Sequence, residues 1–465
     1  MKDPLSPELE AKALELASRM QAKASEITLQ LARELVSTTD ATLFGETEFK
    51  LRDQVMKLVG VAYNEHLGQK KNGYVGSSTV CPQCRGTAGF HDYRPRRVLS
   101  LGGQIEFQRG YYYCRLCGVG TAPWDGAVGL GEGRQTPVVA QLTTLAGAVA
   151  DSFEKGAELL EEMTGLSQSE SAVQQTTESA GERIAASFSR GKSFGKSEPW
   201  PWFSDANGES VGYVAIDATG VRQQGKGGEK ADGRMAYVGM VFNPVPDRER
   251  VFEAEPKPGE AMKARYVSGL YSLHEMGPLM RLQGAQVGLD RASTWVALSD
   301  GGNGLEDFLR TNFPRVEAVI LDFFHATEYL GKLASALHPN DEALSQNRVA
   351  EWSRLLKEEG GDVLIATLEE WGWPPGKALA AVREEVLGYF RNQVHRMDYP
   401  TYLANGWFIG SGAVESACKT VVGRLKGSGM RWGESGAHAV CHVRALYRSE
   451  KGQWEAFWKH RQPAI

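Results

Sequence analysis

Two Cys-x-x-Cys pairs constrain the fold of this chain more than any other feature. Cys81 and Cys84 form the first pair, and Cys114 and Cys117 form the second, with 29 residues between them. Each pair directs two thiolates at one point, and two pairs complete a tetrahedral Zn(S)4 shell without an open position. We therefore expect one structural Zn2+ per protomer; the alternative is a redox-active pair or four unrelated thiols.

The residues around the cysteines predict a zinc ribbon over 78–128. Side chains alternate in polarity from Arg97 to Tyr113 around a Gly102-Gly103 turn, which indicates a β-hairpin. Gly86 and Gly118 follow the two pairs and suit the tight turns that a metal demands. This region also contains five arginines, which form either a face that contacts phosphate groups or an ordinary solvated surface. They are Arg94, Arg96, Arg97, Arg109 and Arg115.

The rest of the chain predicts a multidomain α+β protein. Hydrophobic residues make up 42% of its 465 residues, enough for several cores. The regions expected are a helical one over 1–75, helices over 135–190, α/β structure over 205–338, and helices over 339–405 and 406–460. The leucines between residues 9 and 35 form a packing face, either within the chain or between protomers.

Charge and apolar content exclude several classes of protein. The net charge is −5, from 52 basic and 57 acidic side chains, so nucleic acid would have to bind at a local basic patch. No apolar run approaches 18 residues and the polar start does not look like a signal peptide, so we expect no membrane partner. Six cysteines in so long a chain favour the reducing cytoplasm.

Residues 152–177 predict a helix-turn-helix within the region 135–190. A first helix would end at a Thr164-Gly165 turn, and a second would begin at Ser167 or Ser169. Any helical hairpin with a glycine turn has a similar pattern, so DNA reading is one of two interpretations. The second helix would present neutral polar groups suited to base edges: Gln168, Ser171, Gln174, Gln175 and Thr177.

Three apolar, strand-like runs each end in an aspartate: Asp217, Asp300 and Asp322. An acid at the carboxyl end of a buried strand lies where α/β sheets do chemistry. Two such acids on neighbouring strands would lie within reach of one metal, and their hard oxygen atoms suit Mg2+ or Mn2+. One strand-end aspartate is often a turn former, but three in one region weaken that interpretation.

Glu415 is a fourth candidate acid. It follows a Gly-Ser-Gly turn that is expected to begin a helix. Because the stretch around it is basic, its carboxylate could bind a metal ion beside a phosphate backbone. Taken alone, Glu415 is equally a helix N-terminal acid. The basic residues that follow it are Lys419, Arg424, Lys426 and Arg431.

Four further residues are expected to have structural roles. Cys418 and Cys441 should be small buried hydrophobes. His438 and His442 are four residues apart, so they share a helix face. Without a neighbouring acid motif, we expect these histidines to pack or to contact phosphate rather than to hold a metal.

These motifs resemble those of a known family. The string Gly410-Ser-Gly-Ala-Val-Glu415-Ser-Ala-Cys-Lys419, followed by Gly423-Arg-Leu-Lys-Gly-Ser-Gly-Met-Arg-Trp432, resembles the C-terminal signature of ISKra-type insertion-sequence transposases. Ile216-Asp217-Ala-Thr-Gly, Asp300-Gly-x-x-Gly-Leu and Asp322-Phe-Phe-His325 are similar to motifs of DDE transposases, including the Mutator-like ones. The resemblance covers roughly residues 151–447.

The resemblance implies a ribonuclease-H-like core over 205–338, split by the helical insertion 339–405 and completed by 406–460. Asp217, Asp300 and Glu415 would be the catalytic acids and would hold two Mg2+ (or Mn2+) ions. Asp322 and His325 would be accessory. Strand position alone leaves Asp322 as a rival to Asp300.

The function expected on this basis is a DNA transposase that cuts the ends of an insertion sequence and joins them to target DNA. Its partner would be double-stranded DNA, bound by a homodimer or higher oligomer in a prokaryotic cytoplasm, associated with the nucleoid. The alternatives are a metal-dependent nuclease, a domesticated transposase, or a non-catalytic zinc-ribbon and helix-turn-helix regulator. The expected DNA contacts are Gln168, Ser171, Gln174, Gln175, Lys419, Arg424, Lys426 and Arg431.

Overall fold

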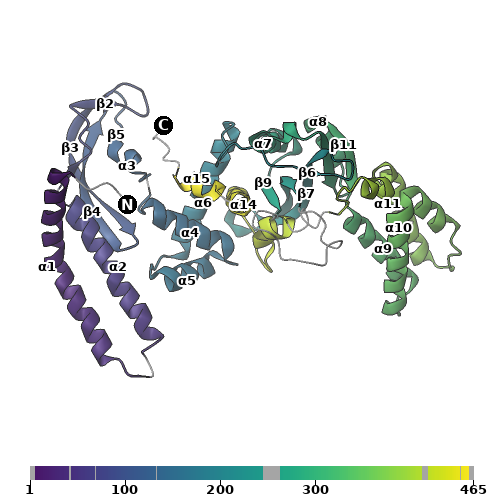
Figure 1. Ribbon diagram of the computed structural model, residues 1–465, viewed down its shortest axis with the longest axis horizontal. Helices are drawn as coiled ribbons and strands as arrows, with labels where there is room; N and C mark the ends of the chain where they lie inside the picture. Colours follow the sequence, from purple (N-terminus) through teal and green to yellow (C-terminus); the bar gives the residue numbers. More distant parts are fainter. Residues whose placement is uncertain are drawn as a thin grey trace. The chain divides into compact units, whose positions relative to one another are not determined.

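The computed structural model describes all residues except 1–5, 41–42, 69, 132, 245–261, 411–416, 451 and 460–465. The described residues form a multidomain α+β protein with two mixed sheets (Figure 1). The chain divides into two compact units, Met1–Thr177 with Trp458–Ile465, and Glu178–Phe457.

Two long helices begin the first unit: α1 spans Pro7–Ser37 and α2 spans Glu46–Leu67. The Ser6 side chain caps α1 by accepting a hydrogen bond from the backbone N–H of Leu9, and Pro7 occupies the first turn. α1 contacts α2, yet none of its residues is buried, and Leu14 is 66% exposed. The predicted leucine face is therefore only partly covered within the described chain.

The sheet of the first unit contains the predicted hairpin. β3 and β4 pair without interruption up to the turn, from Asp92↔Tyr111 to Ser100↔Gly103. Gly102 in this turn lies against Gly60 of α2, and a Cβ atom on Gly60 would be 2.3 Å from the carbonyl oxygen of Gly102. Only glycine allows this approach. The strands, in the order β1-β4-β3-β2 with β5 beside β4, are β1 (Lys71–Asn72), β2 (Ser78–Val80), β3 (Thr87–Ser100), β4 (Gly103–Tyr113) and β5 (Gly120–Thr121).

Helices make up the remainder of the first unit. Thr136 and Ser152 cap α4 and α5 with their side chains. α4 and α5 approach closely because Gly156 has no side chain: a Cβ atom there would be 3.0 Å from the carbonyl oxygen of Ala146. The helices are α3 (Pro123–Ala127), α4 (Pro137–Val149), α5 (Phe153–Thr164) and the first part of α6 (Glu170–Ser189), which belongs to the first unit as far as Thr177.

A mixed sheet forms the centre of the second unit, with strand order β9-β8-β7-β10-β11 and β6 paired to β7. β7, β8 and β9 form an antiparallel meander, whereas β10 is parallel to β7 and β11 is parallel to β10. Helices α7 and α14 pack against the meander. The strands are β6 (Phe203–Ser204), β7 (Ser210–Gln224), β8 (Lys230–Asn243), β9 (Lys263–Gly269), β10 (Thr294–Ser299) and β11 (Val316–Leu321).

Small residues fit α7 onto this sheet. Ser272 and Glu275 form a capping box at the start of α7. The helix then packs on β8 at Gly239, where a Cβ atom would lie 2.4 Å from the Sδ atom of Met280. α7 spans Leu273–Gln286. The remaining helices outside the helical region after β11 are α8 (Leu305–Asn312), α14 (Glu434–Arg448) and α15 (Gln453–Lys459).

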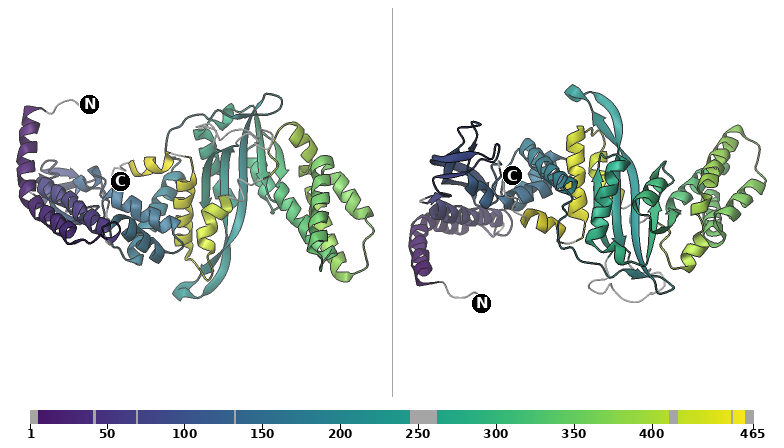
Figure 2. Two further views of the ribbon diagram at one scale, coloured as in Figure 1. Left: turned by 60° about the horizontal axis from the view of Figure 1, so that its bottom comes forward. Right: turned by 90° about the horizontal axis from the view of Figure 1, so that it is seen from above.

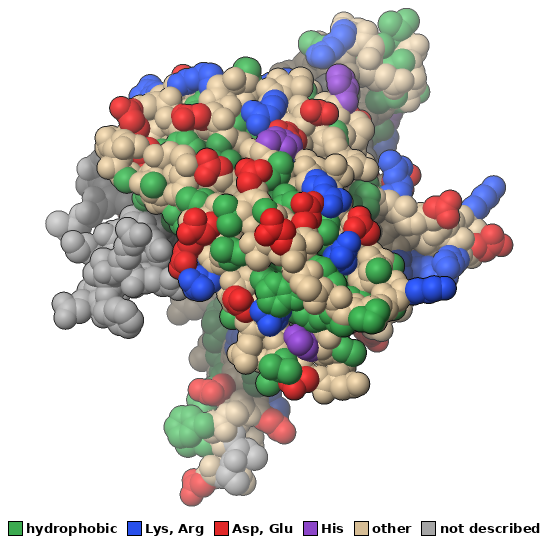
Figure 3. Space-filling model, turned by 90° about the vertical axis from the view of Figure 1, so that its right-hand side faces the viewer, with side chains coloured by type: hydrophobic (Ala, Val, Ile, Leu, Met, Phe, Trp, Pro, Cys, Tyr) green, Lys and Arg blue, Asp and Glu red, His purple; other side chains and the backbone are tan. Residues whose placement is uncertain are grey.

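Helices predominate from β11 to residue 404, as the sequence predicts for 339–405. α10 is interrupted at Gly360, whose φ of +87° is accessible to glycine. On the face seen in Figure 3, which these helices dominate, acidic and basic side chains are interspersed. The helices are α9 (Phe323–Leu337), α10 (Glu342–Glu370), α11 (Lys377–Gln393) and α12 (Tyr399–Ala404). Short helical turns span Lys226–Gly228, Leu289–Arg291, Val394–Arg396, Cys418–Val422 and Gly423–Lys426.

Candidate functional site

Asp217, Asp300 and Asp322 lie side by side on three neighbouring strands of the second sheet. Asp300 and Asp322 directly follow β10 and β11, as predicted, but the prediction that Asp217 ends its strand is wrong, because β7 continues to Gln224 in its pairing with β8. Ile216 of β7 pairs with Ser299 of β10, which pairs with Leu321 of β11. The next residue on each strand is an aspartate: Asp217, Asp300 and Asp322. Parallel pairing in register therefore brings together acids that are far apart in sequence, at the edge where α/β sheets place their chemistry.

Asp217 and Asp300 face a common, partly buried space. Burial raises the pKa of the Asp217 carboxyl group, a hydrogen bond from the Cys418 thiol opposes this shift, and the nearby carboxylate of Asp300 raises the pKa further. The side chain of His325 is also close enough to influence this pKa. Two carboxylates that repel each other in a desolvated space favour a bound cation.

Asp322 has a different role in this row. It is 7% exposed, and its carboxylate accepts a hydrogen bond from the backbone N–H of Phe324 (2.9 Å), which caps α9. This geometry favours Asp300 over Asp322 as the partner of Asp217. Glu415 lies outside the described residues. Within the described part of the chain, no three acidic, histidine or cysteine side chains converge at this edge to form a ligand set.

Arg396 holds the backbone at this edge and was not predicted as a site residue from the sequence. Its side chain is 1% exposed and comes from the end of the helical region. The guanidinium donates hydrogen bonds to the carbonyl oxygens of Ser299 (3.0 Å) and Asp300 (3.2 Å), and to that of Val319 (3.2 Å). Arg396 thus ties β10 to β11 directly beside Asp300. Nothing in the local sequence pattern distinguishes it from a solvated arginine.

Replacing Arg396 with methionine is expected to destabilise the second unit by about 3 kcal/mol or more, because several buried carbonyl groups lose their donor. Urea unfolding followed by tryptophan fluorescence measures this change. Arg391→Met is the matched control, because its ion pair with Glu369 is exposed and is worth at most about 1 kcal/mol. Equal unfolding midpoints for the two variants would refute the clamping role.

An aromatic pair borders Asp300. Tyr389 of α11 stacks on Tyr329 of α9, with ring centroids 3.8 Å apart. The Tyr389 ring lies over Gly301, where a Cβ atom would be 2.4 Å from it. Asp300 contributes to the raised pKa of Tyr389, after burial and Tyr329. The helical region therefore forms one wall of the space that contains Asp300.

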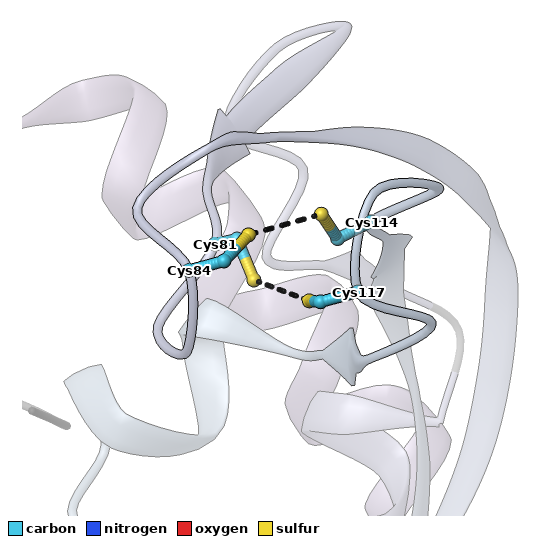
Figure 4. Close-up of side chains that lie close together, drawn as sticks. All are labelled: Cys81, Cys84, Cys114 and Cys117. Carbon is cyan, nitrogen blue, oxygen red and sulfur yellow. Dashed lines mark hydrogen bonds between the residues drawn. The ribbon is translucent and has the colours of Figure 1, made fainter.

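The four paired cysteines converge in the first unit (Figure 4). The Sγ atoms of Cys81 and Cys117 are 3.6 Å apart, and those of Cys84 and Cys114 are 3.5 Å apart. All four sulfur atoms lie within 4.8 Å of one another. Sulfur atoms around a tetrahedral Zn2+ are about 3.8 Å apart, given a Zn–S distance of about 2.3 Å. The group can hold a structural metal ion and is consistent with Zn2+.

Two similar turns carry these cysteines. The backbone N–H of Cys81 donates to Gly86 (2.7 Å), and that of Cys114 donates to Val119 (2.9 Å). The left-handed residue is Gly118 in the second turn but Arg85 in the first, with φ of 61°. Gly86 is not left-handed. Gly86 instead makes room for Cys84, whose Sγ atom would be 3.3 Å from a Cβ atom.

Backbone donors favour the thiolate form of two of the four cysteines. The N–H group of Cys84, with a contribution from Gln83, lowers the pKa of Cys81 to about 6 against the opposing effect of burial. The N–H group of Cys117 likewise lowers the pKa of Cys114. The neighbouring thiols and burial raise the pKa of Cys84 and that of Cys117, against the lowering effect of the backbone at Gly86 and Val119.

The proposed reading helix exposes only some of the predicted residues. α5 ends at Gly165, which is left-handed with φ of 73°, as a helix C-terminus followed by a tight turn requires. Thr177 is fully buried and is not available to DNA. Gln168 donates a hydrogen bond to Thr143 (2.8 Å). The residues that remain exposed are Ser171, Gln174 and Gln175.

The basic residues after Glu415 also differ in exposure. Arg424 is 7% exposed, and its guanidinium lies over the ring of Trp432, 5.1 Å from the centroid. It therefore packs in the core, where a phosphate has little access. Lys419, Lys426 and Arg431 are exposed.

Two arginines of the first unit are committed to a buried carboxylate. Asp125 accepts a hydrogen bond from Arg109 (2.8 Å) and forms an ion pair with Arg96. Both arginines are therefore bound to Asp125 within the domain. They form neither a phosphate-contacting face nor an ordinary solvated surface. Arg97 pairs with Glu106, while Arg115 is exposed and forms no ion pair among the described residues.

His438 and His442 pack in the second unit, which confirms the packing alternative. The Tyr271 hydroxyl lies 2.6 Å from Nε2 of His442, and the backbone N–H of Leu270 donates to Nδ1 of His438 (3.2 Å). His442 is fully buried, as is Cys441, and Cys418 is 8% exposed. Burial and the neighbouring His438 lower the pKa of His442 to about 3.

Acid is therefore expected to destabilise the second unit through His442. Unfolded histidine has a pKa of about 6.5, so between that pH and about 3 the unfolded chain binds a proton that the folded chain rejects. The stabilisation is complete above pH 6.5 and falls as the pH drops, by up to about 1.4 kcal/mol per pH unit. Urea titrations at several pH values measure this slope.

His442→Gln should flatten the pH dependence, while His274→Gln, at an exposed position, should leave it unchanged. Identical slopes for wild type and His442→Gln would contradict the assignment.

Compared with models of known protein families and with curated proteins, the chain matches none of them. Among the residues that the structure describes, no helix has the length and apolar character needed to cross a membrane.

Proposed function

We propose that this protein is a DNA transposase that uses metal-dependent phosphoryl transfer to cut and join DNA. The observation that carries the proposal is the register of β7 with β10, which puts Asp217 and Asp300 side by side in a partly buried space. The sheet order β9-β8-β7-β10-β11, an antiparallel meander followed by two parallel strands, supports a ribonuclease-H-like core. The motif resemblance supports the same assignment.

The residues at this edge fit divalent cations such as Mg2+ or Mn2+. Asp217 and Asp300 supply hard oxygen donors, and Glu415 would complete the set. When bound, such ions activate the attacking oxygen and stabilise the leaving oxygen of an in-line displacement. Asp217 and Asp300 would orient the metals, Asp322 would hold the start of α9, and His325 would face the same space from that helix.

The first unit would supply recognition of the element's ends. The exposed side chains Ser171, Gln174 and Gln175 of α6 suit base edges in a major groove. The four-cysteine domain would hold one Zn2+ and stiffen the fold beside it. Double-stranded DNA is the proposed partner, and joining two ends would require a dimer or higher oligomer.

A supercoiled plasmid carrying the gene with its native flanking DNA tests the proposal. Incubation with Mg2+ should cut at the borders of the element and yield joined products, whereas EDTA should prevent both. Metal-dependent cutting at random positions would indicate a nuclease instead. Binding without cutting, in Mg2+ and in Mn2+, would overturn the proposal in favour of a regulator.

A further inference from the structure

The β7–β8 hairpin extends beyond the rest of its sheet. β10 pairs with β7 only as far as Ile216, and β9 pairs with β8 only from Tyr237 onward. β7 and β8 nevertheless remain paired up to Gln224 and Lys230. In both views of Figure 2 the teal ribbon formed by these strands projects past the other strands. A two-stranded ribbon of this length needs further support to be stable.

That support comes from residues 426–432, which run along one edge of the ribbon. The backbone N–H of Trp432 donates to the carbonyl oxygen of Arg222 (3.0 Å), and Gln223 and Trp432 form a parallel bridge. Near the other end of the segment, the Lys426 ammonium donates to the Thr219 hydroxyl (2.7 Å). Thr219 is two residues beyond Asp217 on β7, so this edge leads directly to the acid pair.

The combined surface, residues 218–236 with 426–434, is basic although the chain as a whole is acidic. Its six basic residues are Arg222, Lys226, Lys230, Arg234, Lys426 and Arg431, against the three acids Glu229, Asp232 and Glu434. Arg234 pairs with Glu434. Lys226, Lys230 and Arg431 are exposed and form no ion pair with any carboxylate in the described parts of the chain. Their charges are available to an anionic partner.

We infer that this basic ribbon surface binds the phosphate backbone of double-stranded DNA and guides it to Asp217 and Asp300. The inference rests on the proposed function, since it assigns the path of the DNA that the acid pair would cut. Proteins that hold single strands stack the bases on aromatic side chains. Residues 218–236 contain no aromatic residue, and Trp432 of the segment 426–434 is buried, so charge contacts to a duplex backbone are favoured.

The length of the ribbon sets the expected footprint. Gln224 is seven residues beyond Asp217, which at ~3.3 Å per residue is ~23 Å. Base pairs repeat every ~3.4 Å, so the tip would contact the duplex about seven base pairs from the position that the acids cut. Duplexes that end closer to the cut position should lose the contribution of Lys226 and Lys230.

The test is equilibrium binding of the full chain to a 30-base-pair random duplex, measured by fluorescence anisotropy in EDTA at several salt concentrations. The double variant Lys226→Gln/Lys230→Gln should bind about tenfold more weakly at low salt. The slope of log K against log salt should fall by about two, since two phosphate contacts are lost. Lys357→Gln/Lys377→Gln, on exposed helical positions of the same unit, is the control of equal charge.

Three outcomes would overturn the inference. They are an unchanged slope in the hairpin variant, an equal loss of affinity in both double variants, and a loss of affinity for a single strand of the same sequence without a loss for the duplex. Because EDTA prevents cutting, binding is separated from catalysis. If the hairpin variant binds DNA more weakly but the wild-type protein never cuts DNA, the DNA-binding surface is supported and the proposed function is refuted.

Discussion

Asp217→Asn is expected to abolish metal-dependent DNA cleavage, by about 10³-fold or more, while the second unit remains folded. The amide keeps the shape of the side chain but removes the charge that would hold a metal. Because the pKa of Asp217 is raised by burial, the folded state disfavours its charge. The variant should therefore be as stable as wild type or more stable without added metal. Cleavage of a labelled end duplex and thermal unfolding measure both effects.

Metal-linked stability provides the second readout for this variant. Mg2+ or Mn2+ should raise the melting temperature of the wild type, because a ligand that binds only the folded state stabilises it. The rise should be lost in Asp217→Asn and in Asp300→Asn, and kept in the exposed control Asp290→Asn. Normal cleavage by either acid variant would remove that residue from the catalytic set.

Cys114→Ser is expected to cause the largest loss of stability, confined to the four-cysteine domain. Structural Zn2+ sites contribute about 10 kcal/mol or more of apparent binding free energy, which is folding free energy in small metal domains. The variant should lose zinc by metal analysis, and the strands β2–β5 should become sensitive to protease. The second unit should resist the protease as before.

Two controls accompany the cysteine variant. Cys441→Ser, at a cysteine outside the cluster, should retain about one zinc per chain. A strong chelator should reproduce the effect of Cys114→Ser on the wild type, and Zn2+ should reverse it. A wild-type protein that contains no zinc and has a protease-resistant domain would refute a metal role for these thiols.

Local features of this fold were predictable from the sequence because their causes lie within a few residues of one another. The spacing of the cysteine pairs, the Gly102-Gly103 turn and the helix over residues 7–37 each depend on local periodicity or turn chemistry. The position of Asp300 after the end of β10 was predictable for the same reason, whereas the continuation of β7 beyond Asp217 depends on its pairing with β8 and was not. The left-handed conformation of Arg85 could not be predicted, because side chains other than glycine rarely adopt it.

The sequence by itself therefore determined which residues could carry chemistry: the four paired cysteines and the acids that follow apolar runs. Only the tertiary structure decided which of them meet and which basic residues are exposed. Arg396 binds carbonyl groups almost 100 residues away, at Asp300, and Arg424 is buried under Trp432 while Lys426 reaches Thr219. Burial and electrostatic environment are set by contacts between distant segments, and a local residue pattern does not contain those contacts.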